Sequence, residues 1–382
     1  MSDGKVVRPN AGEPKLVTYL NRRGVALGLP IGGTFELTAR CNFDCRMCYV
    51  HQKNVAELLP RELTADQWLS LASDARDRGM TFLLLTGGEP TLRSDFARIY
   101  TELIRMGILV SINTNGSTYG GELRELFRKY PPVRLNVTLY GGSEETYSEL
   151  CGNASFGRVV SNLRSMRADG LQVRLNVTLT PYNVGDMEKI DEISREIGLQ
   201  AKTTAYMYPP VRVTGETGSN AARFDAAEAG RVFAKWNFLR DTREDFLRRA
   251  DLMQKRLDAG VADNCVDELG EGVMCRAGRS AFWMTWDGVM LPCGTMPPYE
   301  DAPKPLEVGF DEAWRRTRAY TAAIRLPHEC AVCPDRQNCS VCASICRCET
   351  GRFDGRSDYI CALTKSRREE TIRLANTLIE EK

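Results

Sequence analysis

The chain is poor in histidine: its 382 residues include only His51 and His328. Two imidazoles are too few for a zinc catalytic site built on several histidine ligands. They also leave little material for a Ser-His or Cys-His nucleophilic centre. The shortage therefore argues against both of these common kinds of active site.

Long apolar runs and an excess of one charge are absent as well. No stretch reaches the ~18 consecutive apolar residues that a membrane span needs. The first fifteen residues, MSDGKVVRPNAGEPK, have no apolar core after their charges, unlike a secretory signal. The net charge is +1, from 51 basic and 50 acidic residues, which gives no support to a polyanion-binding surface. We therefore expect a cytoplasmic protein whose partners include neither a membrane nor a nucleic acid.

Cysteine, by contrast, is plentiful, with fourteen residues. In a reducing cytosol, clustered thiols more often bind metal or do redox chemistry than form disulfides. Three lie within 41–48, one is Cys151, and ten lie between 265 and 361. Two metal-binding regions therefore frame a cysteine-poor middle.

Residues 33–207 alternate between strand and helix patterns. In the helix expected at 64–79, Thr64 is the predicted cap and Gln67 occupies the capping-box position. Right-handed crossovers between parallel strands would curl the sheet into an α/β fold, a partial (β/α)6 TIM-like barrel. The strands are expected at 33–38, 81–87, 108–114, 133–139, 173–179 and 200–207.

An internal repeat supports this arrangement. The heptapeptide VRLNVTL occurs at 133–139 and again at 173–179. Identical segments one βα unit apart predict neighbouring strands of one parallel sheet.

The domain organisation follows from changes in these patterns. A loosely held lead-in precedes the barrel, and an Arg-rich helical bridge with a solvated face follows it. A loop-rich, cysteine-rich auxiliary-cluster domain and a C-terminal helix complete the chain. The expected bounds are 1–32, 33–208, 209–264, 265–362 and 363–382, in that order.

The first cysteine cluster has the spacing CxxxCxxC and directly follows the first predicted strand, as Cys41, Cys45 and Cys48. Three thiolates hold three irons of a 4Fe–4S cubane and leave the fourth iron open to an external ligand. A structural zinc or an ordinary cluster usually takes four protein ligands. His51 is the alternative fourth ligand, and three free thiols are the remaining alternative.

This loop resembles that of the radical S-adenosylmethionine (SAM) superfamily, which has such a triad after its first barrel strand. The family usually has an aromatic residue just before the third cysteine, whereas here Met47 has that place and Tyr49 follows. The second predicted strand ends in TGGEP, which matches the family's GGEP motif. The resemblance implies that this motif receives the SAM amino group, with Glu89 offsetting its charge. The motif consists of Gly87, Gly88, Glu89 and Pro90.

Two later turns extend the resemblance, which covers residues 33 to about 207. Residues 113–116, NTNG, stand where the family has its TNG-type turn and make Asn115 a SAM-binding candidate. Thr138 ends the fourth strand, where the family often has a hydroxyl that meets the SAM ribose. The alternative for Thr138 is a strand residue that only packs.

The second cysteine region resembles the SPASM extension found behind many radical SAM barrels. Residues 288–293 have its GxxxxC pattern, and residues 330–339 have its CxxCxxxxxC pattern. The resemblance implies two auxiliary 4Fe–4S clusters. Cys275, Cys293 and Cys342, with Cys265 as a further candidate, would hold the first, and Cys330, Cys333, Cys339 and Cys361 the second.

One departure from this pattern leaves a ligand open. Two residues, instead of the usual three, separate Cys339 from the next cysteine, and Cys346 and Cys348 follow closely. Which of Cys342, Cys346 and Cys348 is the ligand is not decided by the spacing. Each leftover thiol would be a buried core thiol, a hydrogen-atom donor or an anchor for the substrate. Zinc is the alternative metal for this region.

The resemblance also implies an activity. The reduced cluster would cleave SAM to methionine and a 5′-deoxyadenosyl radical, which removes a hydrogen atom from an unactivated C–H bond. Auxiliary clusters would take up the electron left on the substrate, so that a C–S, C–C or C–O bond forms or a dehydrogenation results. SPASM enzymes mostly act on peptides, and the expected reaction is therefore the cross-linking of a ribosomally made peptide.

Two protein partners are expected besides the peptide. A flavodoxin or ferredoxin would donate electrons to the clusters. Only 32 residues precede the first predicted strand, too few for a leader-binding domain of roughly eighty residues. A separate leader-binding protein, or the bridge 209–264, would then recognise the leader.

Three alternatives stay open. In a formylglycine-generating enzyme of the sulfatase-maturing type, an Asp commonly follows the cysteine of GxxxxC, whereas Gly294 follows Cys293 here. A small-metabolite dehydrogenase or epimerase is the second alternative. The third is an iron–sulfur electron carrier, which would need neither an open triad nor the GGEP motif.

A substrate contact is expected after the sixth strand. Residues 206–212, YMYPPVR, would lie at the mouth of the barrel, where Arg212 would bind a substrate carboxylate. The alternative is a rigid turn of aromatic residues and prolines.

Overall fold

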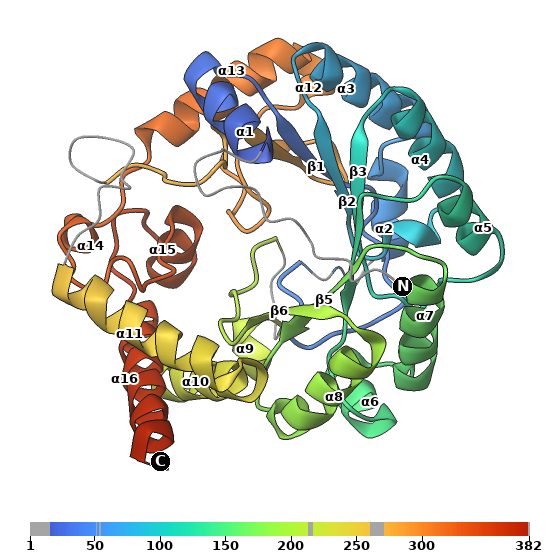
Figure 1. Cartoon of the computed structure of the whole chain (residues 1–382). Helices are drawn as coiled ribbons and strands as arrows, with labels where there is room; N and C mark the ends of the chain where they lie inside the picture. Colours follow the sequence, from blue (N-terminus) through green and yellow to red (C-terminus); the bar gives the residue numbers. More distant parts are fainter. Residues whose placement is uncertain (1–15, 51, 53–54, 213–216, 260–270, 381–382) are drawn as a thin grey trace.

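The computed structural model describes residues 16–50, 52, 55–212, 217–259 and 271–380. Six strands pair in parallel and in chain order, and they form the inner arc of the molecule in Figure 1. They are β1 (Gly32–Glu36), β2 (Phe82–Thr86), β3 (Leu109–Thr114), β4 (Arg134–Thr138), β5 (Val173–Thr178) and β6 (Gln200–Thr204). The predicted α/β partial barrel is confirmed.

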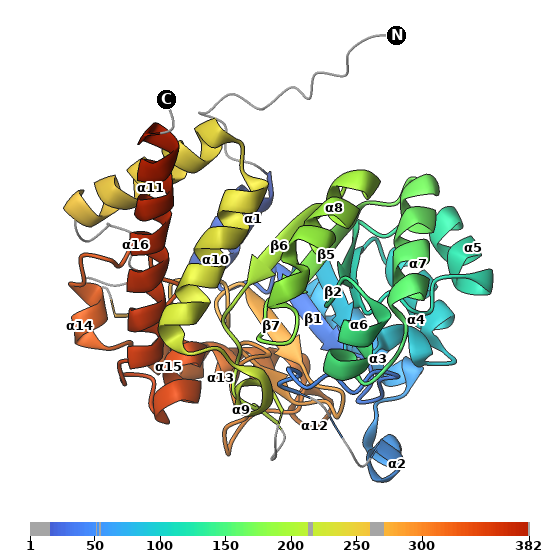
Figure 2. The same cartoon turned by 90° about the horizontal axis from the view of Figure 1, so that it is seen from below.

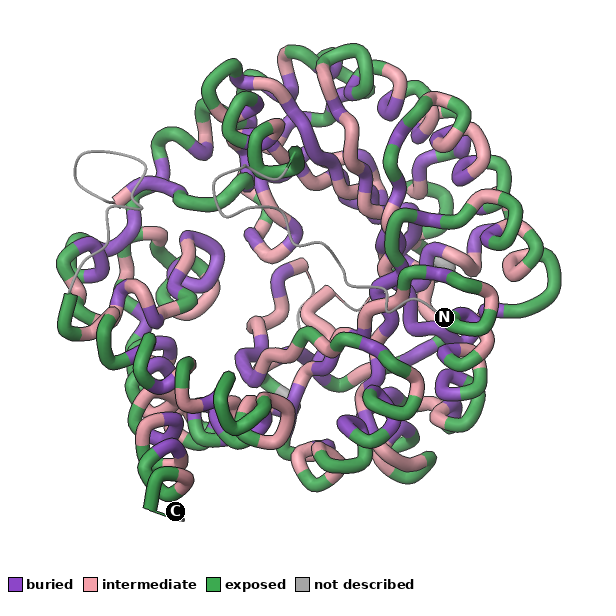
Figure 3. Tube along the Cα trace, in the orientation of Figure 1, coloured by how far each residue is buried: buried purple, intermediate pink, exposed green. Residues whose placement is uncertain are grey.

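Helices cover the outer face of this sheet. They are α3 (Ala65–Asp77), α4 (Phe96–Arg105), α5 (Gly121–Lys129), α6 (Glu144–Cys151), α7 (Phe156–Ala168) and α8 (Met187–Ile197). Figure 3 shows the result as buried strands inside a rim of helices whose outer sides are exposed.

Local sequence accounts for the beginning and end of α3. The Thr64 side chain accepts from the backbone of Gln67, and the Gln67 side chain accepts from the backbone of Thr64, which completes the predicted capping box. Trp68 and Leu71 lie on the buried face. Gly79 follows the helix with a φ of +108°, a backbone conformation that favours glycine.

The repeated heptapeptide forms neighbouring strands, as predicted. In the pairing of β4 with β5, Leu135 lies opposite Val173 and Val137 lies opposite Leu175. The two copies are therefore offset by two residues, which keeps the same face of both strands toward the core.

The lead-in differs from the prediction within its described part. Residues Leu16–Leu27 form helix α1, which is not loosely held. Its buried residues are Asn21 and Gly24, and a Cβ at Gly24 would lie 2.3 Å from the Ile31 side chain. The expectation of a loose segment is wrong here because a small residue and an amide make the contact, which leaves no hydrophobic stripe to detect.

The C-terminal region adds two strands to the same sheet, which the sequence did not predict. Strand β7 (Ala281–Met284) pairs in parallel with β1, and β8 (Met290–Leu291) pairs antiparallel with β7. The sheet of the described residues thus has eight strands. The cysteine-rich region is therefore joined to the barrel at the β1 edge.

Three long helices form a second layer beside the barrel. Helix α16 (Asp358–Glu380) packs along α10 (Ala226–Arg240) and α11 (Arg243–Ala259), as Figure 2 shows. None of the helices in the described ranges combines the length and the apolar character that a bilayer crossing requires. The remaining helices are α2 (Val55–Leu58), α9 (Ser219–Ala222), α12 (Pro305–Val308), α13 (Phe310–Ala323), α14 (His328–Ala331) and α15 (Ala343–Thr350). The predicted domain bounds stay predictions.

Candidate active site

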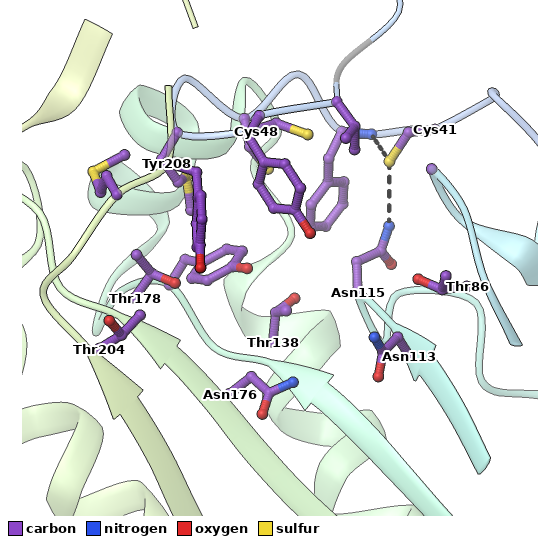
Figure 4. A pocket seen from close by; sticks show the side chains of 18 of the residues that line it. Cys41, Cys48, Thr86, Asn113, Asn115, Thr138, Asn176, Thr178, Thr204 and Tyr208 are labelled. Atoms are coloured by element: carbon purple, nitrogen blue, oxygen red, sulfur yellow. Dashed lines mark hydrogen bonds between the residues drawn. The ribbon is translucent and has the colours of Figure 1, made fainter. Parts of the chain in front are cut away.

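One cavity of about 490 Å³ lies at the C-terminal ends of β2 to β6. The cysteine loop after β1 forms one wall and the strand ends form the other, as Figure 4 shows. Barrel enzymes place their chemistry at this end of the strands. The predicted residues that line the cavity are Cys41, Cys45, Cys48, Gly87, Gly88, Asn115 and Thr138.

The loop that carries the cysteine triad rests on the end of α6. Asp44 and Arg46 donate their backbone N–H groups to the carbonyls of Cys151 and Leu150, at 2.8 and 2.9 Å. The Phe43 ring is buried edge-on against Tyr147, with 6.3 Å between ring centroids. These contacts hold the backbone of the loop in place.

The surroundings of the triad keep its thiols protonated in the absence of a metal. Burial raises the pKa of Cys41 and of Cys48 to about 12. A hydrogen bond with Cys151, together with burial, raises the pKa of Cys45. Thiols in such surroundings become thiolates when a metal takes the proton's place. Three thiols on one cavity wall thus fit a cluster that is bound by three cysteines.

Two N–H groups point at the sulfur of Cys41. The backbone N–H of Phe43 lies 3.4 Å from it, and the Asn115 side-chain nitrogen lies at 4.0 Å; Figure 4 draws both contacts. Asn115 also donates to the Asn42 side chain at 2.8 Å. The turn after β3 therefore supports the cysteine loop directly.

The two glycines of the GGEP motif allow a close approach of two backbones. Gly88 donates to the Thr38 carbonyl at 2.9 Å, so the turn after β2 continues the pairing with the segment before Cys41. A Cβ at Gly88 would lie 2.2 Å from the Arg40 carbonyl oxygen, and one at Gly87 would lie 2.5 Å from that of Thr38. Any larger residue would push the cysteine loop away.

Glu89 has a different setting from the one expected. It is fully buried and is not among the residues that line the cavity, and Pro90 is not either. Its carboxylate accepts from Thr114 Oγ1 at 2.9 Å and from the Asn115 backbone at 2.7 Å. In the structure this carboxylate joins the GGEP turn to the NTNG turn. Its contact with the SAM amino group stays a prediction.

Several cavity residues were missed by the sequence reasoning. Asn176, Thr178, Lys202 and Thr204 extend the polar floor along β5 and β6. Thr178 holds the same place in the second copy of the repeat as Thr138 does in the first. The repeat was therefore a signal for Thr178, whereas β6 carries no comparable motif.

Tyrosines line the cavity opposite this polar floor, beside the cysteine loop. Tyr206 and Tyr208 come from the segment that was expected to line a substrate site, and their rings meet at 4.9 Å. Tyr208 also contacts Tyr49, the residue after Cys48, at 5.7 Å. An aromatic wall of this kind binds the apolar part of a ligand and excludes water.

Arg212 is engaged within the protein. Its guanidinium forms an ion pair with Glu36 and donates to the Gly294 carbonyl at 2.8 Å, and both charged side chains are buried. The Trp283 indole also donates to Glu36, at 2.8 Å. Arg212 is not among the cavity-lining residues, so its contact with a substrate carboxylate stays a prediction. The ion pair instead connects the end of β1 with the C-terminal region.

The C-terminal cysteines gather in two groups. Burial raises the pKa of Cys342, which has Cys293 and Cys275 as its thiol neighbours. Burial raises the pKa of Cys330 to about 11, with Cys339, Cys361 and Cys333 as its thiol neighbours. The two predicted ligand sets stay predictions, and Cys265 lies outside the described residues. Within the part of the chain that the structure describes, no three metal-binding side chains converge on a single ion.

Comparisons with known proteins agree with this geometry. Residues 35–193 match the radical SAM superfamily. The AdoMet-dependent heme synthase of Methanosarcina barkeri is 24% identical over 335 residues, 84% of this chain and 93% of the relative. The PqqA peptide cyclase of Streptomyces rochei is 24% identical over 358 residues, 90% of this chain and 92% of the relative.

A solved structure shows the same fold. Native anSMEcpe with bound AdoMet and Cp18Cys peptide aligns with a TM-score of 0.65 at 17% identity, over 92% of this chain and 99% of that one. Together with the cysteine triad and the glycine turn at one cavity, these matches identify residues 35–193 as a radical SAM domain.

Proposed function

We propose that the protein is a radical SAM enzyme that oxidatively modifies a peptide. The observation that carries the proposal is the convergence of the cysteine triad, the glycine turn, Asn115 and Thr138 on one cavity. Cys41, Cys45 and Cys48 would hold a 4Fe–4S cluster with one iron open to SAM. When bound, the cluster and SAM supply a 5′-deoxyadenosyl radical, which removes a hydrogen atom from the substrate.

The residues of the chain position these groups. Asn115 supports the loop of Cys41, and Gly88 lets the backbone of the GGEP turn lie close to that loop. The Thr138 hydroxyl is available for the SAM ribose. The tyrosine wall keeps water away from the reacting atoms, which protects a radical from side reactions.

A peptide is the favoured substrate for two reasons. A relative that matches nearly the whole chain is a peptide cyclase, and the solved structure of similar fold holds a peptide beside AdoMet. The formylglycine-generating alternative is disfavoured at Gly294, where a Cβ would lie 2.3 Å from the Trp283 ring. An Asp at this position would require Trp283 to leave Glu36.

The two C-terminal cysteine groups would hold two auxiliary 4Fe–4S clusters that take up the substrate's electron. Tyr208 lies between the cavity and the first of these groups: its hydroxyl bonds to Thr295, and Cys342 and Cys293 are near. A flavodoxin or ferredoxin would supply electrons, and a separate protein would present the peptide leader.

A second candidate function is the modification of a small molecule. It is favoured by the heme synthase relative, which matches 84% of this chain. The polar floor made by Asn176, Thr178 and Lys202 suits a substrate with hydroxyl or carboxylate groups.

A SAM cleavage assay tests whether the protein is a radical SAM enzyme, and isotope transfer tests whether its substrate is a peptide. The anaerobic protein with SAM and a reductant should yield 5′-deoxyadenosine, whereas the C41A/C45A/C48A variant should yield none. With a deuterated precursor peptide, deuterium should enter 5′-deoxyadenosine and the peptide should lose two hydrogens. Absence of 5′-deoxyadenosine overturns the enzyme proposal. SAM cleavage in which deuterium is transferred only from small molecules overturns the proposal that the substrate is a peptide.

A further inference from the structure

Helix α15 carries two thiols that the expected ligand sets do not use. Cys346 and Cys348 are two residues apart on this helix (Ala343–Thr350), which separates their side chains by about 200° around the axis. The helix begins at Cys342, its N-cap residue and an expected ligand. The two thiols therefore face different surroundings although they are close in sequence.

Cys348 faces the loop that carries Cys293. Its sulfur lies 3.4 Å from the Thr295 carbonyl oxygen, and Ser344, one turn earlier, donates to the same oxygen at 2.5 Å. The Cys293 sulfur lies 3.2 Å from the hydroxyl of Thr295. Cys293 and Cys348 thus flank a single residue, Thr295.

Further contacts place Cys348 with the first cysteine group. Cys342 and Cys293 are thiol neighbours of Cys348, and Cys342 in turn has Cys293 and Cys275 as neighbours. Four thiols from three segments therefore belong to one neighbourhood. Four cysteines are the usual complement of a 4Fe–4S cluster.

Cys346 has the opposite setting. It is fully buried, its thiol neighbours are Cys330, Cys342 and Cys339, and its backbone N–H bonds to the Cys342 carbonyl within the helix. The second group already has four cysteines: Cys330, Cys333, Cys339 and Cys361. Cys346 is therefore a core thiol.

We propose that Cys348 is the fourth ligand of the auxiliary cluster held by Cys275, Cys293 and Cys342. The inference rests on the proposed auxiliary clusters and deepens them. A cluster with four thiolates has no open iron for a substrate. Because Thr295 also lines the cavity, this cluster lies at the cavity wall, where it accepts an electron without binding the substrate.

The test uses the full chain without its triad, so that the auxiliary sites are observed alone. The C41A/C45A/C48A variant is reconstituted anaerobically with iron and sulfide and should bind about eight irons, two clusters' worth. Adding C348A should leave one cluster with a labile iron. Mild oxidation should then release about one iron per chain and produce the EPR signal of a three-iron cluster.

Three further variants complete the test. C346A, the matched control on the same helix, should behave like the triad-free parent. C265A should also behave like the parent. C348S, which keeps an oxygen ligand and nearly the same volume, should retain the iron with a shifted EPR spectrum.

The outcomes separate the two proposals. A C348A spectrum identical to that of the parent overturns the assignment of Cys348, as does a three-iron signal in C265A or C346A instead. If the triad-free parent binds no iron at all while the complete chain still cleaves SAM, the auxiliary clusters fail and the triad stands.

Discussion

The two cysteine regions of this protein are held in different ways. The triad occupies eight residues of one loop, whose backbone is hydrogen-bonded to the end of α6, while the segment just before it is hydrogen-bonded to the turn after β2. The expected auxiliary ligands extend from Cys275 to Cys361, on short helices and loops. Cys275 and Cys361 are exposed. The first site is therefore formed by the barrel itself, whereas we expect the second to depend on bound metal to hold its segments together.

The core beneath each region shows the same contrast. Phe35, Leu37 and Leu85, around the strands that lead to the triad, are completely buried. Cysteine side chains themselves make up part of the buried surface in the second region, with Cys330 and Cys346 in the core. Removing metal should thus leave the barrel folded and loosen the region around 330–361.

A buried ion pair joins the two regions. Glu36 at the end of β1 binds Arg212 and Trp283, and β7 extends the sheet from β1. Burial raises the pKa of Glu36, and the Arg212 charge opposes this shift. The regions differ in their support, but they are packed as one body.

The largest expected effect is the loss of the triad. Replacing Cys41, Cys45 and Cys48 by Ala should lower the rate of 5′-deoxyadenosine formation by at least about a thousandfold, or roughly 4 kcal/mol of activation free energy. The control is C346A, because Cys346 is a buried cysteine of the second region that lies outside both expected ligand sets. Residual cleavage above a few per cent in the triple variant would place the radical chemistry elsewhere.

A smaller loss is expected from Gly88→Ala. Its Cβ would meet the Arg40 carbonyl oxygen at 2.2 Å and displace the cysteine loop. SAM cleavage should fall about 10- to 100-fold, or roughly 1.4–2.8 kcal/mol, with iron content reduced less. Gly185→Ala is the matched control, since a Cβ there has nothing within 4 Å. Equal activities of the two variants would show that the close approach is not needed.

Short-range motifs made the barrel and its triad predictable. The capping box of α3 and the CxxxCxxC loop after β1 each lie within one segment, and the repeat in β4 and β5 spans two successive βα units. The structure that each motif predicts depends on residues close to it in the chain, so the sequence alone was sufficient to predict it.

Contacts between distant segments were not predictable in this way. The partner of Arg212 is Glu36, 176 residues away, and an Arg at a barrel mouth looks equally suited to a substrate. Helix α1 contacts Ser280 of the C-terminal region through Asn21 and the Ile31 side chain through Gly24, which no hydrophobic pattern reveals. The bonds of Glu89 to Thr114 and Asn115 were not predicted either, because these partners lie one βα unit further on.

The third effect is smaller again and concerns the cavity floor. Thr138→Val keeps the shape of the side chain and removes its hydroxyl. If the hydroxyl bonds to the SAM ribose, about 1 kcal/mol of binding is lost, which should raise the KM for SAM about fivefold. Thr34→Val, in β1 and away from the cavity, is the control. An unchanged KM would mean that Thr138 only packs.

The smallest effect on SAM cleavage is expected from removing cysteines of the second region. This change tests the contrast between the two cysteine regions most directly. In C275A/C293A the barrel still holds the triad through its own backbone contacts. Cleavage should therefore stay within about twofold of the unchanged chain, less than roughly 0.5 kcal/mol. Peptide product should nevertheless be lost, because the cluster at the cavity wall that accepts the substrate's electron is missing, so the ratio of product to 5′-deoxyadenosine falls toward zero. C346A should keep both quantities. If cleavage in C275A/C293A fell as far as in the triad variant, the two regions would depend on one another for folding, and the independence of the barrel site would be wrong.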